Sequence, residues 1–374
     1  MLSTINIGTP NNHDGDPLRT SFTKTNDGIT KLNNATTGVF NILDYGAISD
    51  DGIADQAAIQ AAVDAAAAYG SDPQGGKVVI PAGKWYITGA VTLRSYIQVE
   101  VDANAHFYFP SNYSGSMWYN PPGNILQFCS VNGGYYGDYT MTRTWKCIDL
   151  RASDFTTSYV MFCKFSNMYI ENCNIGINKV VTLTGWENGN SYNNITIWDP
   201  IIGIQMTHPV ATGGGMGDNK FINTEVQTLV GVTTYCVNMI NCLYNNFTNL
   251  SCYDIAGSTI GVNLDSTSSK NSFMGSCGFV GSTFADGGMD NIYFSNYDGN
   301  IYLGYGSQIG FYNNQCSIVH GGNTLTLNAS AGVIMSKLKI TALSTYANNT
   351  AALSGGLTAG MVYRTSTGQL MIVY

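Results

Sequence analysis

The sequence GGKVVIPAGKWYI, Gly75 to Ile87, is preceded by VFNILDYGAISDD, Val39 to Asp51. The later stretch carries the valine, isoleucine and aromatic residues typical of β-strands, and Pro81 and Gly83 interrupt it. These stretches predict short strands separated by tight turns. The segment between the two stretches must connect the first strands to the later ones.

The connecting segment has the pattern of one amphipathic helix. Asp55 is expected to be its N-cap, and Gly70 suits the left-handed conformation that follows a last helical turn. Apolar residues form a stripe at helical spacing: Ala58, Ile59, Ala62, Val63 and Ala66. Because this stripe is rich in alanine, it would let the helix approach a sheet closely and cover one end of a β structure.

Asparagine residues recur ahead of short apolar pairs in the middle of the chain. The markers are Asn167, Asn194, Asn219, Asn246, Asn271 and Asn291, at intervals of 27, 25, 27, 25 and 20 residues. Periods in this range are typical of solenoids, and strands with Gly and Asn turns favour a β-helix over a helical repeat. Asparagine tolerates the left-handed conformation, so the markers predict a tight turn in each coil.

The stretches at Val39–Asp51 and Gly75–Ile87, with the helix between them, resemble the N-terminal cap of the pectate lyase superfamily. The polar segment Ile5 to Asn33 resembles the short attachment segment of many phage tail and neck proteins. The tail from Gly321 resembles the C-terminal β modules that hold three chains together in phage structural proteins. The chain is therefore similar to bacteriophage tail spikes and tail fibres.

The expected fold class is all-β, a right-handed parallel β-helix with an N-terminal capping α-helix. Residues 1–35 would form a virion-attachment segment, 36–320 the β-helix with its cap at 39–93, and 321–374 a C-terminal β trimerisation or tip module. Within this last part, Met361–Arg364 and Gln369–Tyr374 alternate in polarity across a Thr-Ser-Thr-Gly turn. That pattern predicts a hairpin.

The composition argues against several classes of partner. Charged residues are 11% of the chain and the net charge is −8, without a basic run, so nucleic acid is not an expected partner. No export signal and no apolar stretch of spanning length is present, so membrane insertion is not expected. Nine scattered cysteines without a CxxC pair favour reduced, buried thiols. The four histidines stand apart in sequence, and neither a metal site nor a cofactor is expected.

The resemblance implies that the chain binds or cleaves a polysaccharide. Elimination chemistry on uronic acids needs cations, yet no arginine occurs between Arg151 and Arg364, which disfavours a lyase. The same deficit, with the net charge of −8, disfavours a strongly anionic glycan. Hydrolysis needs two carboxyl groups, about 5 to 5.5 Å apart for retention or about 6.5 to 9.5 Å for inversion.

Four acidic residues, one on each successive coil, are candidates for hydrolysis: Glu171, Asp199, Glu225 and Asp254. Equivalent positions on adjacent coils lie about 4.8 Å apart, so such residues could furnish either geometry. Trp186 and Trp198 each adjoin a carboxylate and could stack on sugar rings. In the alternative interpretation the acids are solvated residues of the rod surface, and the tryptophans only pack.

The interpretation that combines these points is a homotrimeric phage tail spike or fibre that binds host surface polysaccharide during adsorption. Residues 1–35 would join it to other tail proteins of the virion, and the protein would be made in the cytoplasm of the bacterial host. An endoglycosidase that hydrolyses the glycan is the alternative. A cellular extracellular polysaccharide enzyme is a third interpretation, disfavoured by the missing signal peptide and by the phage-like ends.

Overall fold

The computed structural model describes residues 17–70, 74–137, 141–208, 214–228, 233–254, 260–275, 278–280, 283–288, 290–294, 301–303 and 343–374. The chain divides into two compact units, Met1–Ile309 and Gly310–Tyr374. Residues 1–16 of the expected attachment segment lie outside the described residues. The boundary expected between residues 320 and 321 also lies outside them.

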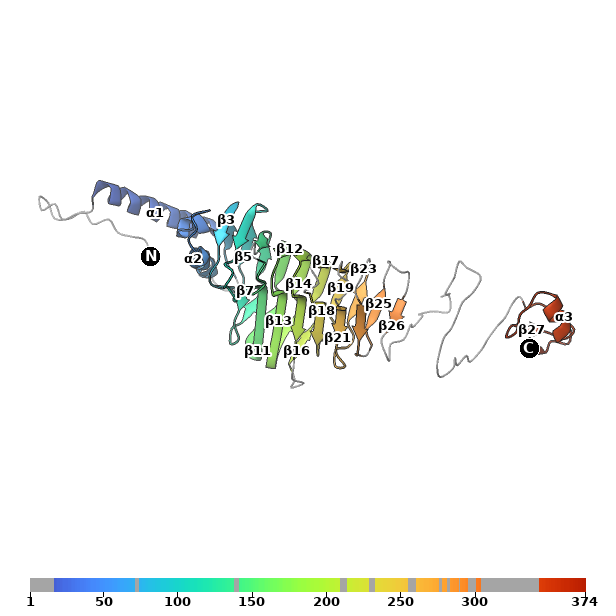
Figure 1. Cartoon of the computed structure of the whole chain (residues 1–374). Helices are drawn as coiled ribbons and strands as arrows, with labels where there is room; N and C mark the ends of the chain where they lie inside the picture. The colour runs from blue at the N-terminus through green and yellow to red at the C-terminus, as the bar shows by residue number, and fades with distance from the viewer. Residues whose placement is uncertain are drawn as a thin grey trace, which may run out of the picture. The chain divides into compact units, whose positions relative to one another are not determined.

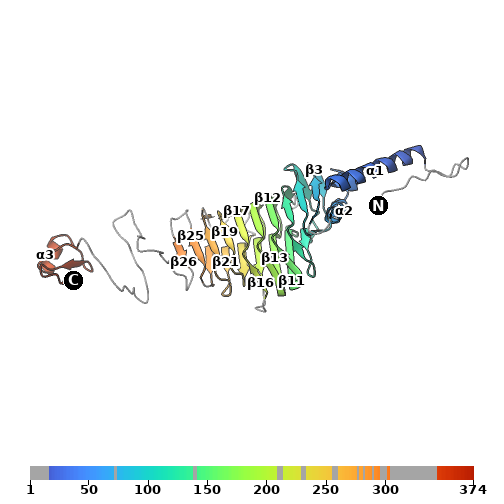
Figure 2. The same cartoon turned by 180° about the vertical axis from the view of Figure 1, so that it is seen from behind.

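The first unit is a parallel β-helix whose coils stack their strands into two long sheets, as Figures 1 and 2 show from opposite sides. The first sheet runs in the order β1 (Val39–Asn41), β2 (Lys77–Ile80), β5 (Gln98–Val101), β9 (Ser130–Asn132), β12 (Lys164–Glu171), β14 (Ser191–Trp198), β17 (Lys220–Thr228), β19 (Asn246–Thr248), β22 (Ser272–Met274), β25 (Ile292–Phe294) and β26 (Ile301–Leu303). Further strands pair within it: β3 (Gly83–Tyr86), β6 (Ala105–Tyr108), β10 (Tyr135–Gly137), β20 (Ser251–Asp254) and β23 (Gly278–Val280).

The second sheet closes the other side of each coil. Its order is β24 (Thr283–Asp286), β21 (Ile260–Leu264), β18 (Tyr235–Ile240), β15 (Ile202–Thr207), β13 (Ile175–Asn188), β11 (Lys146–Met161), β7 (Ser116–Asn120) and β4 (Val91–Thr92), with β16 (Gly215–Gly217) and β8 (Leu126–Gln127) at its side. Among the described strands of this unit, only β25 and β26 pair antiparallel. The expected parallel β-helix is confirmed.

One buried aromatic ring per coil follows the inside of the first sheet. The stack comprises Phe165, Tyr192, Phe221, Phe247 and Phe273, with neighbouring ring centroids 4.5–5.5 Å apart and nearly parallel planes. Its members are 27, 29, 26 and 26 residues apart along the chain. Because equivalent positions stack on one another, the solenoid period expected from the sequence is confirmed.

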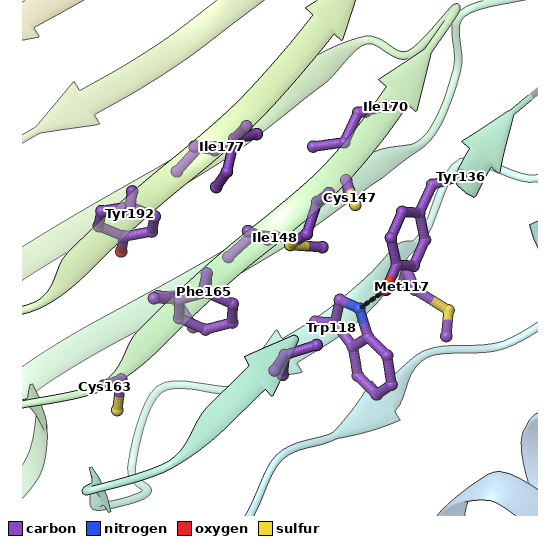
Figure 3. Packing of buried hydrophobic residues seen from close by; sticks show 14 of the residues in the cluster. Met117, Trp118, Tyr136, Cys147, Ile148, Cys163, Phe165, Ile170, Ile177 and Tyr192 are labelled. Carbon is purple, nitrogen blue, oxygen red and sulfur yellow. Dashed lines mark hydrogen bonds between the residues drawn. The ribbon is translucent and has the colours of Figure 1, made fainter. Parts of the chain in front are cut away.

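Figure 3 shows the packed interior around Trp118, whose indole Nε1 donates a hydrogen bond to the Tyr136 hydroxyl at 3.1 Å. Cys147 and Cys163 lie among these apolar side chains, and burial raises the pKa of the Cys163 thiol to about 12. All seven described cysteines are buried free thiols. The expectation of reduced, buried cysteines is confirmed for these seven.

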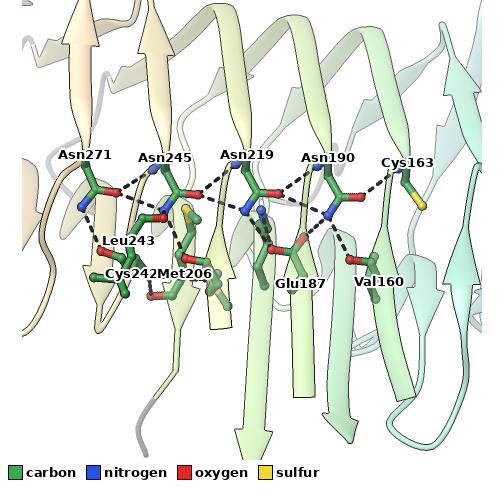
Figure 4. A network of polar contacts seen from close by, with 12 residues as sticks. Val160, Cys163, Glu187, Asn190, Met206, Asn219, Cys242, Leu243, Asn245 and Asn271 are labelled. Carbon is green, nitrogen blue, oxygen red and sulfur yellow. Dashed lines mark hydrogen bonds and ion pairs between the residues drawn. The ribbon is translucent and has the colours of Figure 1, made fainter. Parts of the chain in front are cut away.

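The coils carry two rows of asparagines. The inner row is buried, and Asn190 Oδ1 accepts a hydrogen bond from the backbone N–H of Cys163 at 2.8 Å (Figure 4). In every later member the side-chain Oδ1 accepts from the backbone N–H of the preceding member at 2.9–3.3 Å. Its members are Asn190, Asn219, Asn245, Asn271 and Asn291. The outer row is exposed, with φ of 50–56°, and comprises Asn167, Asn194, Asn223 and Asn249.

The sequence markers therefore mixed the two rows. Asn167 and Asn194 belong to the outer row, whereas Asn219 belongs to the inner row with Asn271 and Asn291. Asn246 directly follows the inner-row residue Asn245 and belongs to neither of the two rows. The expected left-handed conformation is confirmed at Asn167 and Asn194 and was wrong for the other four markers.

The predicted helix is α2 (Gln56–Ala67), which buries Ile59, Ala62, Val63 and Ala66. It packs against β1 and β4, the N-terminal members of the two sheets, so its role as a cap is confirmed. Asp55 stands at the N-cap position, but its carboxylate makes no capping hydrogen bond. It accepts instead from the backbone N–H groups of Ile48 at 3.2 Å and Tyr86 at 2.9 Å, which fastens the helix start to β3.

Two further helical segments of the first unit lie next to β1 in sequence. The helix α1 (Leu18–Thr37) precedes β1, and the short 3-10 helix η1 (Ile42–Tyr45) follows it.

In the second unit, α3 (Asn349–Ser354) packs on the antiparallel hairpin of β27 (Val362–Arg364) and β28 (Leu370–Ile372), around buried Tyr363. The hairpin expected from the sequence is confirmed. No helix in the described part of the chain is long and apolar enough to cross a membrane.

Candidate functional site

An aromatic face lies on the outside of the first sheet, over β3, β6, β10, the C-terminal halves of β12, β14 and β17, and β20. Two rows of outward side chains form it. The His106 row comprises Lys84, His106, Tyr135, Tyr169, Thr196, Glu225 and Ser251. The Tyr108 row comprises Tyr86, Tyr108, Gly137, Glu171, Trp198, Gln227 and Tyr253.

Strand alternation explains why these side chains share one face. The residues between the two rows, such as Trp85, Tyr136 and Ile197, are wholly buried in the core. Because successive side chains of a strand point to opposite sides, both rows must point outward. Their aromatic members are half-buried, so the face offers ring surface to solvent.

Neighbouring rings on this face contact one another along the coils. His106 stacks on Tyr135 with ring centroids 4.7 Å apart, and Tyr135 stacks on Tyr169 at 5.2 Å. In the other row Tyr86 stacks on Tyr108 at 5.7 Å. Trp198 is partly exposed on the same face.

Glu171 lies within the aromatic face, beside Trp198 on the next coil. The Tyr135 hydroxyl donates a hydrogen bond to its Oε2, and the Asn172 amide donates to its Oε1 at 3.2 Å. Partial burial raises the pKa of Glu171, the negative charge of Asp199 raises it further, and the bond from Asn172 opposes both. The hydrogen bonds from Tyr135 and Asn172 thus fix the Glu171 carboxyl group on the aromatic face beside Trp198.

Asp199 is held by an ion pair at the turn that follows β14. The Arg143 guanidinium donates to its carboxylate, and Arg143 Nε donates to its backbone oxygen at 2.9 Å. The Asp199 side chain is only 5% exposed. Arg143 also approaches Asn172, the residue equivalent to Asp199 on the preceding coil, at 3.3 Å. These contacts tie two coils together next to Glu171.

The four acids expected from the sequence do not form one line. Glu171 is in the Tyr108 row and Glu225 in the His106 row, two coils away, so their backbone positions are about 12 Å apart. Asp254 pairs through its backbone with Thr228, and its side chain lies outside the described residues. The register brings Glu171 and Asp199 together, with backbone positions about 6 Å apart on adjacent coils.

The two tryptophans expected to bind sugar lie on different sheets. Trp198 is on the aromatic face, whereas Trp186 is on β13 in the second sheet, 38% exposed, with its ring over Gly215. Glu187, which follows Trp186 in sequence, points into the core and is wholly buried. The carboxylate expected beside the Trp186 ring is therefore not at the surface.

Sequence reasoning missed a polar row on the outside of the second sheet. It comprises Tyr119, Asp149, Asn178, Gln205, Asn238 and Asn263. Burial would raise the pKa of Asp149, but hydrogen bonds from Arg151 and Ser116 and the charges of Arg151 and Lys146 lower it. The amides bond to one another, as from Asn263 Nδ2 to Asn238 Oδ1 at 2.7 Å. The sequence pattern of this polar row was hidden because loops of different length separate the members of the row along the chain.

Metal-binding groups do not gather anywhere among the described residues: no cluster of three or more His, Cys, Asp or Glu side chains occurs there. His106, which is part of the aromatic face, stacks on two tyrosine rings. His208 is buried, and burial lowers the pKa of its imidazole. The groups of the aromatic face therefore offer ring stacking and hydrogen bonding to a ligand.

Comparison with known proteins gives one family and several solved structures. Residues 39–112 match the family described as rhamnogalacturonase A/epimerase, pectate lyase-like. The match spans both stretches that resemble the pectate lyase cap, and it confirms that resemblance for the N-terminal coils. No curated protein matches the chain.

The solved structures that resemble this chain have low sequence identity. A surface adhesin of Streptococcus pneumoniae is 12% identical, with 69% of this chain and 79% of that chain covered and a TM-score of 0.37. An α-1,3-glucanase catalytic unit of Streptomyces thermodiastaticus is 12% identical, with 71% and 49% covered and a TM-score of 0.40. An Acinetobacter baumannii phage tailspike protein is 12% identical, with 67% and 54% covered and a TM-score of 0.34.

Proposed function

We propose that this protein binds a polysaccharide along its aromatic face, as a phage tail spike or fibre protein that recognises a surface glycan of its host. The observation that carries the proposal is the aromatic face itself, where half-buried Tyr, His and Trp rings share one surface with the carboxyl group of Glu171. Sugars present apolar C–H faces and polar hydroxyl edges. Aromatic rings bind the former, and Glu171, Gln227 and tyrosine hydroxyls bind the latter.

The charge of the molecule narrows the class of glycan. Only Lys84 supplies a cation to the aromatic face, and the chain carries a net charge of −8. Since a surface of like sign repels a polyanion, the proposed ligand is a neutral or weakly charged glycan. The proposed setting is the phage virion, with synthesis in the bacterial host cytoplasm, attachment to other tail proteins through residues 1–35, and a homotrimeric assembly.

Binding is tested with surface polysaccharides extracted from a panel of bacterial strains and immobilised for biolayer interferometry. Trp198→Ala is expected to weaken binding about tenfold, or about 1.4 kcal/mol, because the stacked sugar loses its ring. Trp186→Ala is the matched control, since it removes an exposed tryptophan from the other sheet and should leave affinity unchanged. Equal affinities for parent and Trp198→Ala would remove the aromatic face as the binding site.

A second candidate function is hydrolysis of the bound glycan. It is favoured by the raised pKa of Glu171 beside Asp199, whose carboxylate Arg143 holds, because pairs of acids in different environments divide into acid and base roles. In this proposal Glu171 protonates the leaving oxygen, and Asp199 acts as the second carboxylate. Because the Asp199 side chain is buried, the Arg143 ion pair would have to open toward the substrate.

Hydrolysis is tested by following chain length and new reducing ends of the same polysaccharides. Glu171→Gln is expected to lower the rate about a hundredfold or more while binding is retained, because the amide cannot donate the proton. Asp154→Asn, on β11 in the second sheet, is the control that should keep the rate, because this acid lies away from the aromatic face. Binding without any chain shortening by the parent protein would leave a receptor-binding protein without this activity.

A further inference from the structure

The helix α1 exposes large apolar side chains to solvent. Leu18 is 74% exposed, and Phe22, Ile29 and Leu32 are each 61% exposed. Four such residues on one helix of 20 residues are more than scattered surface residues would give. This helix therefore carries an apolar surface that the described residues of the chain leave exposed.

The spacing of these residues is that of a coiled coil. The seam, defined as Leu18, Phe22, Thr25, Ile29, Leu32 and Thr36, alternates steps of four and three residues. A repeat of seven residues with two seam positions has a period of 3.5, which keeps the seam facing a neighbouring helix over several turns. A helix that packs on a globular surface usually shows a wider stripe with a period of 3.6.

The composition of α1 shows that the helix needs a partner. It contains six threonines, three asparagines and Gly28, and it has no acidic residue in its first turn and no basic residue in its last. These residue types have low helix propensity, and even good isolated helices are marginal in water. The free energy that holds this helix together must come from burial of its apolar seam.

The seam is suited to identical helices in parallel. Beside it lie Arg19, Ser21, Asn26 and Gly28, of which only Arg19 carries a charge, whereas Lys24 and Asp27 are displaced away from the seam by the helical repeat. In-register copies would therefore meet with little repulsion between like charges. A different partner protein would gain nothing from charge complementarity along this seam.

The threonines of the seam also fit an apolar contact. The Thr25 hydroxyl donates to the Ser21 carbonyl at 3.0 Å, and the Thr36 hydroxyl donates to the Leu32 carbonyl at 2.8 Å. Because these hydroxyls are satisfied within the helix, burying Thr25 and Thr36 leaves no polar group unpaired. From this pattern we infer that α1 forms a parallel coiled coil with α1 of other copies of this chain.

The inference rests on the homotrimeric assembly of the proposed function and deepens it, because it assigns residues 18–35, about half of the expected attachment segment, to self-association. It is tested by disulfide cross-linking of the full chain. Thr25→Cys, within the seam, is expected to yield about tenfold more covalent dimer under mild oxidation than Thr20→Cys, which points away from the seam. The parent chain contains its own cysteines, so the amount of covalent dimer that it forms under the same conditions is the background level.

The direction of the helices is tested with Leu18→Cys. In parallel copies these positions meet and cross-link, whereas in antiparallel copies they would be separated by about 27 Å along the seam. Equal cross-linking of Thr25→Cys and Thr20→Cys would overturn the inference. Cross-linking of Thr25→Cys at background level in the purified chain would overturn it as well, because the seam would then serve only a different virion protein. Glycan binding does not enter this readout, so a failure of the inference and a failure of the proposed glycan binding are distinguishable.

Discussion

Lys179 and Glu187 form an ion pair inside the β-helix, and neither side chain is exposed to solvent. Lys179 Nζ lies 2.7 Å from Glu187 Oε2, and the amides of Asn190 and Asn219 donate to the two carboxylate oxygens (Figure 4). Burial raises the pKa of Glu187 and lowers the pKa of Lys179, and each charge opposes the shift of the other. The ion pair thus depends on both partners and on the inner asparagine row.

Removing one partner of this pair should be more damaging than removing both. We expect Lys179→Met to lower the free energy of unfolding by about 3–5 kcal/mol, because it leaves a buried carboxylate without a cation. The double variant Lys179→Met with Glu187→Gln should recover most of this loss, since no charge remains to be buried. Urea denaturation followed by tryptophan fluorescence measures both, and additive losses in the double variant would contradict the expectation.

The pH dependence of Lys179→Met follows from the direction of the Glu187 shift. Without Lys179, only the hydrogen bonds from Asn190 and Asn219 oppose the burial that raises the pKa of Glu187, so the folded state binds a proton more tightly than the unfolded state. Such a group stabilises the fold below its unfolded pKa, and this stability is lost as pH rises through the folded pKa. The stability deficit of the variant should therefore be larger at pH 8 than at pH 5.

At the scale of the strand and its turns, the two asparagine rows have different roles. In the inner row Asn219 accepts from the backbone and side chain of Asn190 and donates to Asn245, all in the dry interior. In the outer row Asn194 is exposed, adopts φ of 55° and donates to Asn167 at 2.8 Å. The inner row links coils through buried hydrogen bonds, whereas the outer row allows a sharp bend of the strand.

Substitutions in the two rows should separate these roles. We expect Asn219→Ala to lower the free energy of unfolding by about 2–4 kcal/mol, because it leaves buried donors of Asn190 without an acceptor. Asn194→Gly should change it by less than about 1 kcal/mol, because glycine adopts positive φ without strain. Thermal unfolding of the two variants beside the parent measures the difference, and equal losses would refute the distinction between the rows.

The rows also explain which part of the fold the sequence could predict. Inner and outer asparagines recur with the same period and lie four residues apart, as in Asn219 and Asn223, so periodicity alone cannot separate inward from outward positions. The cap helix was predictable because its signals are local. The site was only partly predictable, because the neighbours of Glu171 depend on coil register, and unequal loops shift that register from coil to coil.

At the scale of the whole molecule, the β-helix must protect the open ends of its two sheets. The helix α2 packs against β1 and β4, where the two sheets begin. Each strand edge presents backbone N–H and C=O groups that would pair with another chain if they were uncovered. A solenoid gains its stability from contacts between neighbouring coils, so disorder at one end spreads inward coil by coil.

Loosening the cap should therefore cause aggregation rather than a simple loss of stability. We expect Val63→Asp, which places a charge on the wholly buried face of α2, to detach the helix and expose the first strands of both sheets. Ala57→Asp introduces the same charge on the exposed side of α2 and is the matched control. Hydrogen exchange should rise first in β1, β2 and β4 of Val63→Asp and later in the following coils, with loss of soluble protein on warming. Uniform exchange along all coils, or equal behaviour of the two variants, would show that α2 decorates the rod without capping it.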